Sequence, residues 1–163
     1  MSTLITGAGV IGCHTARLLA ERGEDVVLLD VNPGAEAIAS IVASPRVAVV
    51  AADVLDHEGL DRLVRSKGVR RIVHTAATLS TGIRANPRRG IAVNVMGMAN
   101  VLECARLAGV ERVVIASSTT VAYSTFGDFH GAAVPDDFAM RAISQRPGSI
   151  YAATKLHAEH LAL

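Results

Sequence analysis

Short apolar runs rich in Val, Ile and Leu alternate with helical patterns along the chain. Apolar runs of about four to six residues without an alternating polar face are typical of parallel strands that helices cover on both sides. We expect such strands at residues 3–6, 26–29, 46–51, 71–75 and 112–116. The pattern predicts an α/β fold, a doubly wound parallel sheet in a three-layer sandwich with strand order 3-2-1-4-5.

The expected helices begin or end at residues with suitable capping chemistry. Asp56 and Asn86 can accept N–H groups of a first turn, and Pro87 suits the first helical position. Gly23 and Gly109 can adopt the left-handed conformation that closes a helix. These signals predict helices from the glycine turn at 7–12 to about 22, at 56–67, at 87–108 and from 149 to 163, with a weak helix at 35–42 and an irregular stretch at 117–148.

Length and composition restrict the class of protein. A chain of 163 residues with 50% hydrophobic residues is long enough for one well-packed domain, so we interpret residues 1–163 as a single domain. Sixteen Lys and Arg against fifteen Asp and Glu, with no Trp, argue against a nucleic-acid platform. We expect neither a membrane span nor a secretion signal. Cys13 and Cys104 are then expected to be reduced core residues of a cytoplasmic protein.

A glycine-rich turn is the first candidate for chemistry. Residues 7–12 read Gly-Ala-Gly-Val-Ile-Gly between a strand and a helix, the arrangement that brings a pyrophosphate to a helix N-terminus. A turn without a ligand is the alternative. Asp30, at the end of the second strand, could accept hydrogen bonds from both ribose hydroxyls and repel a 2′-phosphate, which favours NAD over NADP. Asp53, followed by Val54, either reaches the adenine or forms a turn.

A second candidate lies near the C-terminus, where Tyr151 and Lys155 are spaced i, i+4 on one helix face. A phenol is a poor base at neutral pH, and a neighbouring ammonium stabilises the phenolate. Ser118, just after the fifth strand, could bind the substrate oxygen. By itself a Tyr-x-x-x-Lys pattern is weak. Here it follows the glycine turn, Asp30 and Ser118 in order, which favours one site.

Together with further motifs, the chain resembles the N-terminal part of the extended short-chain dehydrogenase/reductases, the NAD-dependent epimerase/dehydratase family. The further motifs are His74-Thr-Ala-Ala77, Asn94-Val-Met-Gly97, Asn100-Val-Leu-Glu103 and Ala116-Ser-Ser-Thr-Thr-Val121. The resemblance implies a Rossmann-type domain that binds NAD, with Tyr151 as acid/base, Lys155 on the nicotinamide ribose and Ser118 on the substrate hydroxyl. It places these cofactor-binding residues: Gly7, Gly9, Val10, Ile11, Gly12, Asp30, Asp53, Val54, Ala76, Ala77, Asn94, Tyr151 and Lys155.

Four differences from that family bear on what the chain can do. The glycine turn is one residue shorter than the family's Gly-x-x-Gly-x-x-Gly, and Val121-Ala122-Tyr123 replaces its Val-Tyr-Gly. Thr119 and Thr120 stand where its dehydratases have Asp-Glu, and hydroxyls cannot protonate a leaving group near neutral pH, which disfavours dehydration. Family members are also longer, and their C-terminal substrate domain is missing from residues 1–163.

The expected function is therefore epimerisation or oxidation of a secondary hydroxyl in a nucleotide-sugar-like substrate. The alternative is an NAD-binding module without turnover, or half of a split enzyme. Because the residues that would hold the rest of a nucleotide sugar are mostly absent from residues 1–163, we expect these residues alone to bind NAD but to turn over nucleotide sugars negligibly.

Other features give weaker predictions. His157 and His160 could form half a metal site, but nothing completes it, so we expect no metal. Arg84, Arg88 and Arg89 are interpreted as a solvated basic face rather than a phosphate site. The helix at 87–108 carries two apolar stripes where packing on a sheet needs one, which predicts a homodimer through the helices at 87–108 and 149–163, as the resemblance also implies.

Overall fold

The computed structural model describes residues 2–121 and 149–163, and the chain divides into two compact units. The sheet unit comprises Met1–Ala77 and Met96–Ala116, and the helical unit comprises Thr78–Val95 and Ser117–Leu163. The predicted single-domain organisation of residues 1–163 stays a prediction. Residues Ala122 and Tyr123, which depart from the family pattern, lie outside the described residues.

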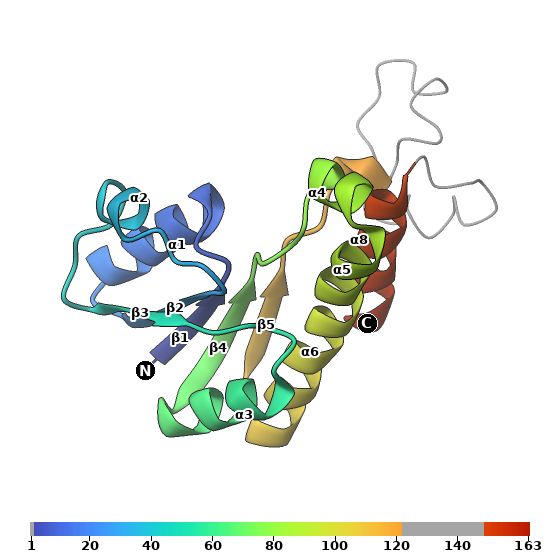
Figure 1. The fold of residues 1–163 in the computed structure, drawn as a ribbon. Helices are drawn as coiled ribbons and strands as arrows, with labels where there is room; N and C mark the ends of the chain where they lie inside the picture. The colour runs from blue at the N-terminus through green and yellow to red at the C-terminus, as the bar shows by residue number, and fades with distance from the viewer. Residues whose placement is uncertain (1, 122–148) are drawn as a thin grey trace, which may run out of the picture. The chain divides into compact units, whose positions relative to one another are not determined.

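The sheet unit contains one five-stranded parallel sheet with the order β3-β2-β1-β4-β5, so the predicted topology is confirmed (Figure 1). The central strands β1 and β2 are almost fully buried, as their apolar sequences require. Observed strand bounds agree with the expected runs to within two residues. They are β1 Ser2–Thr6, β2 Asp25–Asp30, β3 Val47–Ala51, β4 Val69–His74 and β5 Arg112–Ile115.

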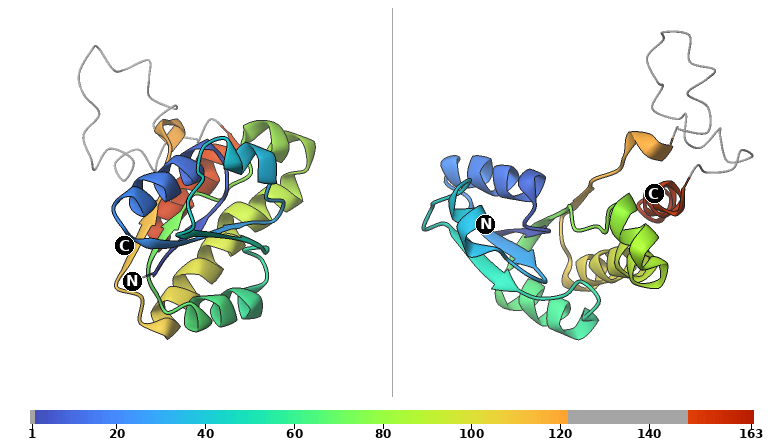
Figure 2. Two further views of the ribbon diagram at one scale, coloured as in Figure 1. Left: turned by 90° about the vertical axis from the view of Figure 1, so that its left-hand side faces the viewer. Right: turned by 45° about the horizontal axis from the view of Figure 1, so that its top comes forward.

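Helices cover both faces of this sheet, which confirms the three-layer arrangement (Figure 2). On one face lie α1 Val10–Glu21 and α2 Ala35–Ala39, and their residues Cys13, Ala16 and Ile38 form a core cluster with Ile5 and Leu28. On the other lie α3 His57–Ser66 and α6 Gly97–Ala108, packed on β4 and on each other.

The amino ends of the strands carry ion pairs, of which Arg46–Asp25 and Arg70–Glu111 are exposed and Arg71–Glu24 is partly buried. Arg46 meets Asp25 at 2.9 Å, Arg71 meets Glu24 at 3.3 Å, and Arg70 pairs with Glu111. Exposed pairs of this kind each contribute roughly 0–1 kcal/mol to stability.

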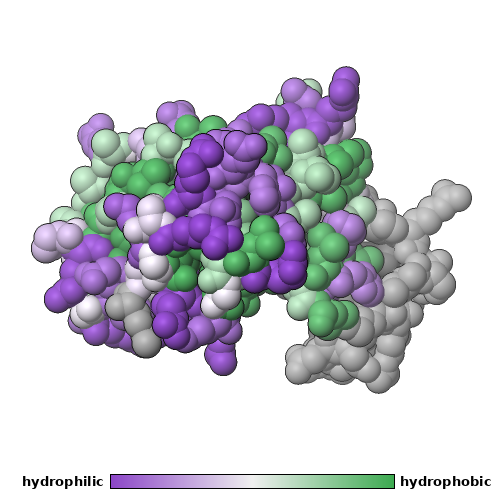
Figure 3. Space-filling model, turned by 90° about the horizontal axis from the view of Figure 1, so that it is seen from below, coloured by the Kyte–Doolittle hydropathy of each residue, from purple (hydrophilic) through white to green (hydrophobic). Residues whose placement is uncertain are grey.

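Hydrophilic and hydrophobic residues are mixed over the face of the molecule seen from below (Figure 3). The glycine turn and Asp30 lie at the opposite, carboxyl ends of the strands, where parallel sheets bind ligands.

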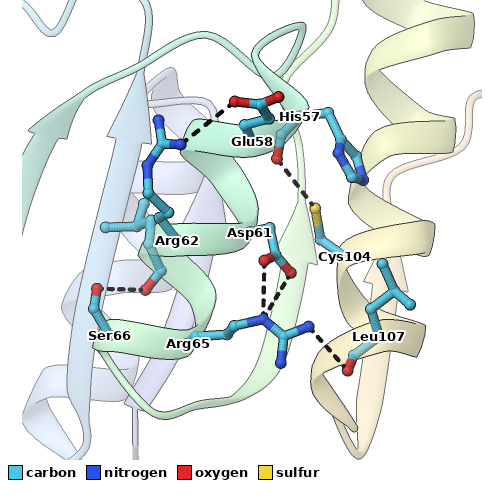
Figure 4. A network of polar contacts seen from close by, with 9 residues as sticks. His57, Glu58, Asp61, Arg62, Arg65, Ser66, Cys104 and Leu107 are labelled. Carbon is cyan, nitrogen blue, oxygen red and sulfur yellow. Dashed lines mark hydrogen bonds and ion pairs between the residues drawn. The ribbon is translucent and has the colours of Figure 1, made fainter.

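The interface between α3 and α6 corrects one argument for a dimer. Val101 and Cys104, on the second apolar stripe of the helix at 87–108, are fully buried within the sheet unit. Cys104 Sγ donates to the His57 carbonyl oxygen at 3.7 Å, and Arg65, held by Asp61, donates to the Leu107 carbonyl oxygen at 3.1 Å (Figure 4). The crossing of α3 from β3 back to β4 covers this stripe, so it needs no second subunit.

Both thiols are predicted to be inert in the folded chain. Burial raises the pKa of Cys104 to about 11, with Asp61 and Glu103 adding to the effect, and burial followed by the Asp30 charge raises the pKa of Cys13. We expect iodoacetamide at about pH 8 to leave both thiols unmodified until the chain is denatured, because only the thiolate reacts. Rapid labelling of the native chain, read by mass spectrometry, would contradict this.

The same shift gives the direction of a pH effect on stability. In the unfolded chain Cys104 loses its proton near its ordinary value of 9.0, and in the folded chain only near 11. The free energy of unfolding should therefore fall as pH rises through that window.

The helical unit contains α4 Ser80–Ala85, α5 Pro87–Ile91 and α8 Ile150–Leu161, which pack against one another (Figure 1). The predicted cap at Asn86 is confirmed, since its side chain accepts the Arg89 N–H at 3.1 Å. The structure adds a cap at Ser149, which accepts the Ala152 N–H at 3.0 Å. The final helix ends at Leu161 rather than continuing to Leu163. Helix α4 and a π-helical turn, Ala92–Met96, between α5 and α6 were not expected.

The helical run Pro87–Ala108 corrects the expectation that no segment reaches membrane-spanning length. Its 22 residues are long and apolar enough by length and composition, and 33% of its most apolar stretch is buried. Core helices of soluble proteins pass the same test. The finding by itself therefore assigns no membrane role.

Candidate active site

The glycine turn closes tightly at Gly7 and Gly12. Gly7 has a φ of +93°, and a Cβ there would lie 2.7 Å from the Ala76 backbone nitrogen. A Cβ on Gly12 would collide with the Gly7 carbonyl oxygen. Both glycines are therefore required by the fold itself: Gly7 for the tight turn and Gly12 for the close approach of the helix to the turn.

Gly9 differs from the other two glycines. Among the described atoms, nothing lies within 4 Å of the position that a Cβ on Gly9 would take. Gly9 precedes α1, whose first turn receives no side-chain cap from the described residues, and Val10 and Ile11 are 69% and 65% exposed. The first N–H groups of a helix lack partners within it and attract anions. This open, uncapped turn fits a pyrophosphate.

Asp30, the last residue of β2, holds the glycine turn in place through a hydrogen bond to a backbone N–H group. Its Oδ2 accepts the Ala8 N–H at 2.8 Å, and its Oδ1 accepts the Asn32 N–H at 2.9 Å. Each carboxylate oxygen can accept a further hydrogen bond, so ribose hydroxyls can still be bound. The sequence predicted the ribose role and missed the support of Ala8.

Asp53 and Val54 are placed differently from the other expected cofactor residues. Asp53 Oδ1 accepts the Leu55 N–H at 3.0 Å, so Asp53 forms the turn that was one of its two interpretations. Val54 is 4% exposed, and its side chain packs against Gly97. That side chain belongs to the core, which leaves only the Val54 backbone for a cofactor. Ala76 and Ala77 are half-buried at the end of β4, beside Gly7.

Asn94 joins three segments of the helical unit. It is 5% exposed and sits in the π-helical turn, a feature often found at functional sites. Its Oδ1 accepts the Thr78 N–H at 2.7 Å, and its Nδ2 donates to the Thr78 carbonyl oxygen and to Thr154 Oγ1, both at 3.1 Å. Thr154 Oγ1 in turn donates to the Tyr151 carbonyl oxygen at 2.8 Å. Asn94 is thereby linked to the first turn of α8.

Tyr151 and Lys155 meet on α8, as their spacing predicted. Lys155 Nζ lies 5.8 Å from the centroid of the Tyr151 ring, a cation–π arrangement. Lys155 is 8% exposed, and this burial lowers the pKa of its ammonium group. Tyr151 is half-buried and so remains open on one side. The pair offers a phenol and a cation at one place.

Ser118 belongs to the helical unit and comes three residues after the end of β5 in the sequence. Its Oγ accepts hydrogen bonds from the Thr120 N–H at 3.3 Å and the Thr120 hydroxyl at 3.0 Å, which leaves the Ser118 proton for another acceptor. The neighbouring Ser117 donates to Glu159 of α8. The helical unit thus contains Asn94, Ser118, Tyr151 and Lys155. Sequence reasoning missed Thr154 and Thr78, because their partners are distant in sequence.

The weaker candidates remain unassigned. His157 and His160 are exposed, and within residues 2–121 and 149–163 no group of three metal-ligating side chains occurs. Arg84, Arg88 and Arg89 are exposed around the junction of α4 and α5, as a solvated basic face would be.

The open space at Gly9 gives a prediction. Gly9→Ala should fold normally, since its φ of −76° suits alanine and no described atom obstructs the methyl group. We expect a loss of NAD affinity of about tenfold or more, because the methyl group fills the space through which a pyrophosphate approaches. Calorimetric titration measures this.

Gly34→Ala is the matched control. Gly34 precedes α2 with a φ of −71°, and its added Cβ would make an ordinary 3.7 Å contact with Ala37. Unchanged NAD affinity in Gly9→Ala, or an equal loss in Gly34→Ala, would show that Gly9 is not at the cofactor site.

Comparisons with known proteins identify the family and the fold. The model of the NAD dependent epimerase/dehydratase family matches residues 3–163. A UDP-glucose 4-epimerase of Yersinia enterocolitica is 35% identical over 127 residues, which cover 74% of this chain and 38% of that protein. A mitochondrial L-threonine 3-dehydrogenase of Sus scrofa is 34% identical over 159 residues, 96% of this chain and 39% of that protein.

Solved structures give the same result. The UDP-glucose 4-epimerase of Thermus thermophilus in complex with NAD superposes with a TM-score of 0.82 and 31% identity, over 99% of this chain and 49% of that chain. The chain therefore spans less than half the length of these three relatives.

Proposed function

This chain belongs to the NAD dependent epimerase/dehydratase family, and we propose that it is the cofactor-binding and acid–base part of an enzyme that oxidises a secondary hydroxyl of a nucleotide sugar. The observation that carries the proposal is the position of the buried Lys155 ammonium over the Tyr151 ring. A phenol beside a cation is suited to exchange a hydroxyl proton.

The residues of the sheet unit fit NAD. The uncapped first turn of α1 and the open space at Gly9 would receive the pyrophosphate, and Asp30 would accept the ribose hydroxyls. NAD, when bound, supplies the hydride acceptor. Asp30 would repel the 2′-phosphate of NADP by like charge.

The residues of the helical unit carry out the proton chemistry. Tyr151 would take the proton of the substrate hydroxyl and return it in the reverse direction, and Lys155 would stabilise the phenolate and bind the nicotinamide ribose. Ser118, whose oxygen already accepts from Thr120, would donate its own proton to the substrate oxygen and so orient it.

Epimerisation or simple oxidation is favoured over dehydration. Thr119 and Thr120 provide no acid for a leaving hydroxyl, and the Thr120 hydroxyl is already bonded to Ser118. A second candidate substrate is a β-hydroxy amino acid, because the similarity to the L-threonine 3-dehydrogenase extends over 96% of this chain.

One set of measurements tests both candidates. The purified chain is titrated with NAD and NADP, then incubated with NAD and UDP-glucose, UDP-galactose or L-threonine. Interconversion of the sugars without net NADH supports an epimerase, and NADH formation with L-threonine supports the second candidate. Absence of NAD binding would contradict the whole proposal.

We also propose a cytoplasmic homodimer. Ile91 of α5 and Ile150 and Leu161 of α8 are 42%, 45% and 40% exposed, so these neighbouring helices present apolar side chains that a second subunit would cover. The two free, buried thiols suit a reducing compartment. Sedimentation at tens of micromolar tests the dimer, and a monomer alone would contradict it.

A further inference from the structure

Thr75 directly follows β4 and contacts the glycine turn, which follows the neighbouring strand β1. Its backbone N–H donates to the Thr6 carbonyl oxygen at 2.9 Å, which continues the pairing of β1 with β4. Its hydroxyl has one proton, which it shares between the same oxygen at 2.8 Å and the Gly7 carbonyl oxygen at 3.1 Å. The backbone N–H of Thr75 thus extends the strand pairing, and its hydroxyl adds a contact with the glycine turn.

The peptide between Gly7 and Ala8 is held at both of its polar atoms. Its carbonyl oxygen, on Gly7, accepts from Thr75, and its N–H, on Ala8, donates to Asp30 at 2.8 Å. These two side chains come from the ends of β4 and β2, on either side of β1. A planar peptide fixed at both ends cannot rotate, so the plane of the turn is set at this point.

The next peptide, between Ala8 and Gly9, has one polar atom held from inside. The Ala8 carbonyl oxygen accepts from Cys13 Sγ at 3.3 Å, and Cys13 is only 1% exposed. In a trans peptide the N–H points opposite to the carbonyl oxygen, so the Gly9 N–H is directed away from the buried sulfur. Gly9 is also the glycine with no described atom within 4 Å of the position that a Cβ would take.

We propose that Thr75 is a positioning residue for the dinucleotide: by holding the Gly7 carbonyl opposite Asp30, its hydroxyl keeps the Gly9 amide directed outward as a donor to the pyrophosphate. The inference rests on the proposed NAD binding. It adds a residue that acts on the cofactor only through the backbone of the turn.

The test compares Thr75→Val, which keeps the shape and removes the hydroxyl, with Thr75→Ser, which keeps the hydroxyl. Calorimetry of the 163-residue chain measures the affinity for NAD and for adenosine, which has no phosphate. Loss of one neutral hydrogen bond corresponds to a roughly threefold to tenfold weaker NAD affinity in Thr75→Val. Adenosine affinity and the melting temperature should stay close to those of the parent chain, because the backbone pairing of Thr75 with Thr6 remains.

Two controls keep the test specific. Thr75→Ser should restore NAD affinity to within about twofold. Thr15→Val removes a hydroxyl that donates to the Ile11 carbonyl oxygen at 2.8 Å in the same unit but does not touch the peptides at 7–9, and it should leave NAD affinity unchanged. If Thr75→Val does not fold, Thr75→Ala replaces it in the same comparison.

Each outcome decides between the two proposals. NAD affinity unchanged in Thr75→Val, an equal loss for NAD and adenosine, or no rescue by serine would overturn the positioning role. A parent chain that binds no NAD would instead overturn the proposed function.

Discussion

Replacing Tyr151 with phenylalanine is expected to lower turnover of the substrate by about 10²–10⁴-fold while NAD affinity stays near that of the parent chain. Phenylalanine keeps the ring that lies 5.8 Å from Lys155 Nζ, so packing on α8 is retained and only the phenol oxygen is lost. Without that oxygen, the proposed acceptor of the substrate's hydroxyl proton is lost. Calorimetry of the 163-residue chain measures NAD affinity. Steady-state rates with the substrate identified among the sugars and L-threonine measure turnover, with a complementing polypeptide present where these residues alone turn over too little.

The other tyrosine of the chain provides the control. Tyr123 lies outside the described residues, and Tyr123→Phe makes the same chemical change. A comparable loss of turnover in Tyr123→Phe, or full activity in Tyr151→Phe, would show that the acid–base group has been assigned to the wrong tyrosine. Parallel loss of NAD affinity in Tyr151→Phe would show that the phenol oxygen also serves cofactor binding, the role that the family resemblance gives Tyr151.

Local chemistry made much of the fold predictable. The central strands β1 and β2 are mostly apolar because they are buried on both faces, while the edge strands β3 and β5 are partly exposed. The caps at Asp56, Asn86 and Ser149 are satisfied by backbone N–H groups within their own first turns. Helix α4 was missed because Ser80–Ala85 has only Ile83 as a buried residue, which gives no periodic pattern. Val101 is covered because α3 connects β3 to β4 and so packs on α6. The hydrophobic periodicity of the helix at 87–108 does not predict this contact.

In the candidate site, too, residues placed by local sequence could be predicted and residues placed by tertiary contacts could not. Gly7, Gly12, Tyr151 and Lys155 were predictable, because a turn or a helical spacing already restricts their geometry. Thr154 and Thr75 were not, since a hydroxyl is read as a surface or helix residue until its partner is known. Their partners, Asn94 and the Gly7 carbonyl, are brought to them by tertiary structure.

Asp30→Asn is expected to reduce the preference for NAD over NADP by about 100-fold, the largest change in cofactor affinity that we predict. Asparagine removes the negative charge that would repel a 2′-phosphate and weakens two charged hydrogen bonds to the ribose, which contribute roughly 1.5–3 kcal/mol each. Its side-chain oxygen can still accept the Ala8 N–H, so the turn keeps its support. Calorimetric titrations of both cofactors give the ratio.

Asp30→Ala separates the two roles of this carboxylate, because alanine removes the acceptor for Ala8 as well as the charge. Loss of ribose recognition alone changes the ratio of the two affinities, whereas loss of support for the Gly7–Ala8 peptide weakens both cofactors by a common factor. We therefore expect the ratio to change similarly in both variants and the common loss to be larger in Asp30→Ala, by about threefold to tenfold. An unchanged ratio in Asp30→Asn would mean that Asp30 serves only the turn, and that the preference for NAD has another source.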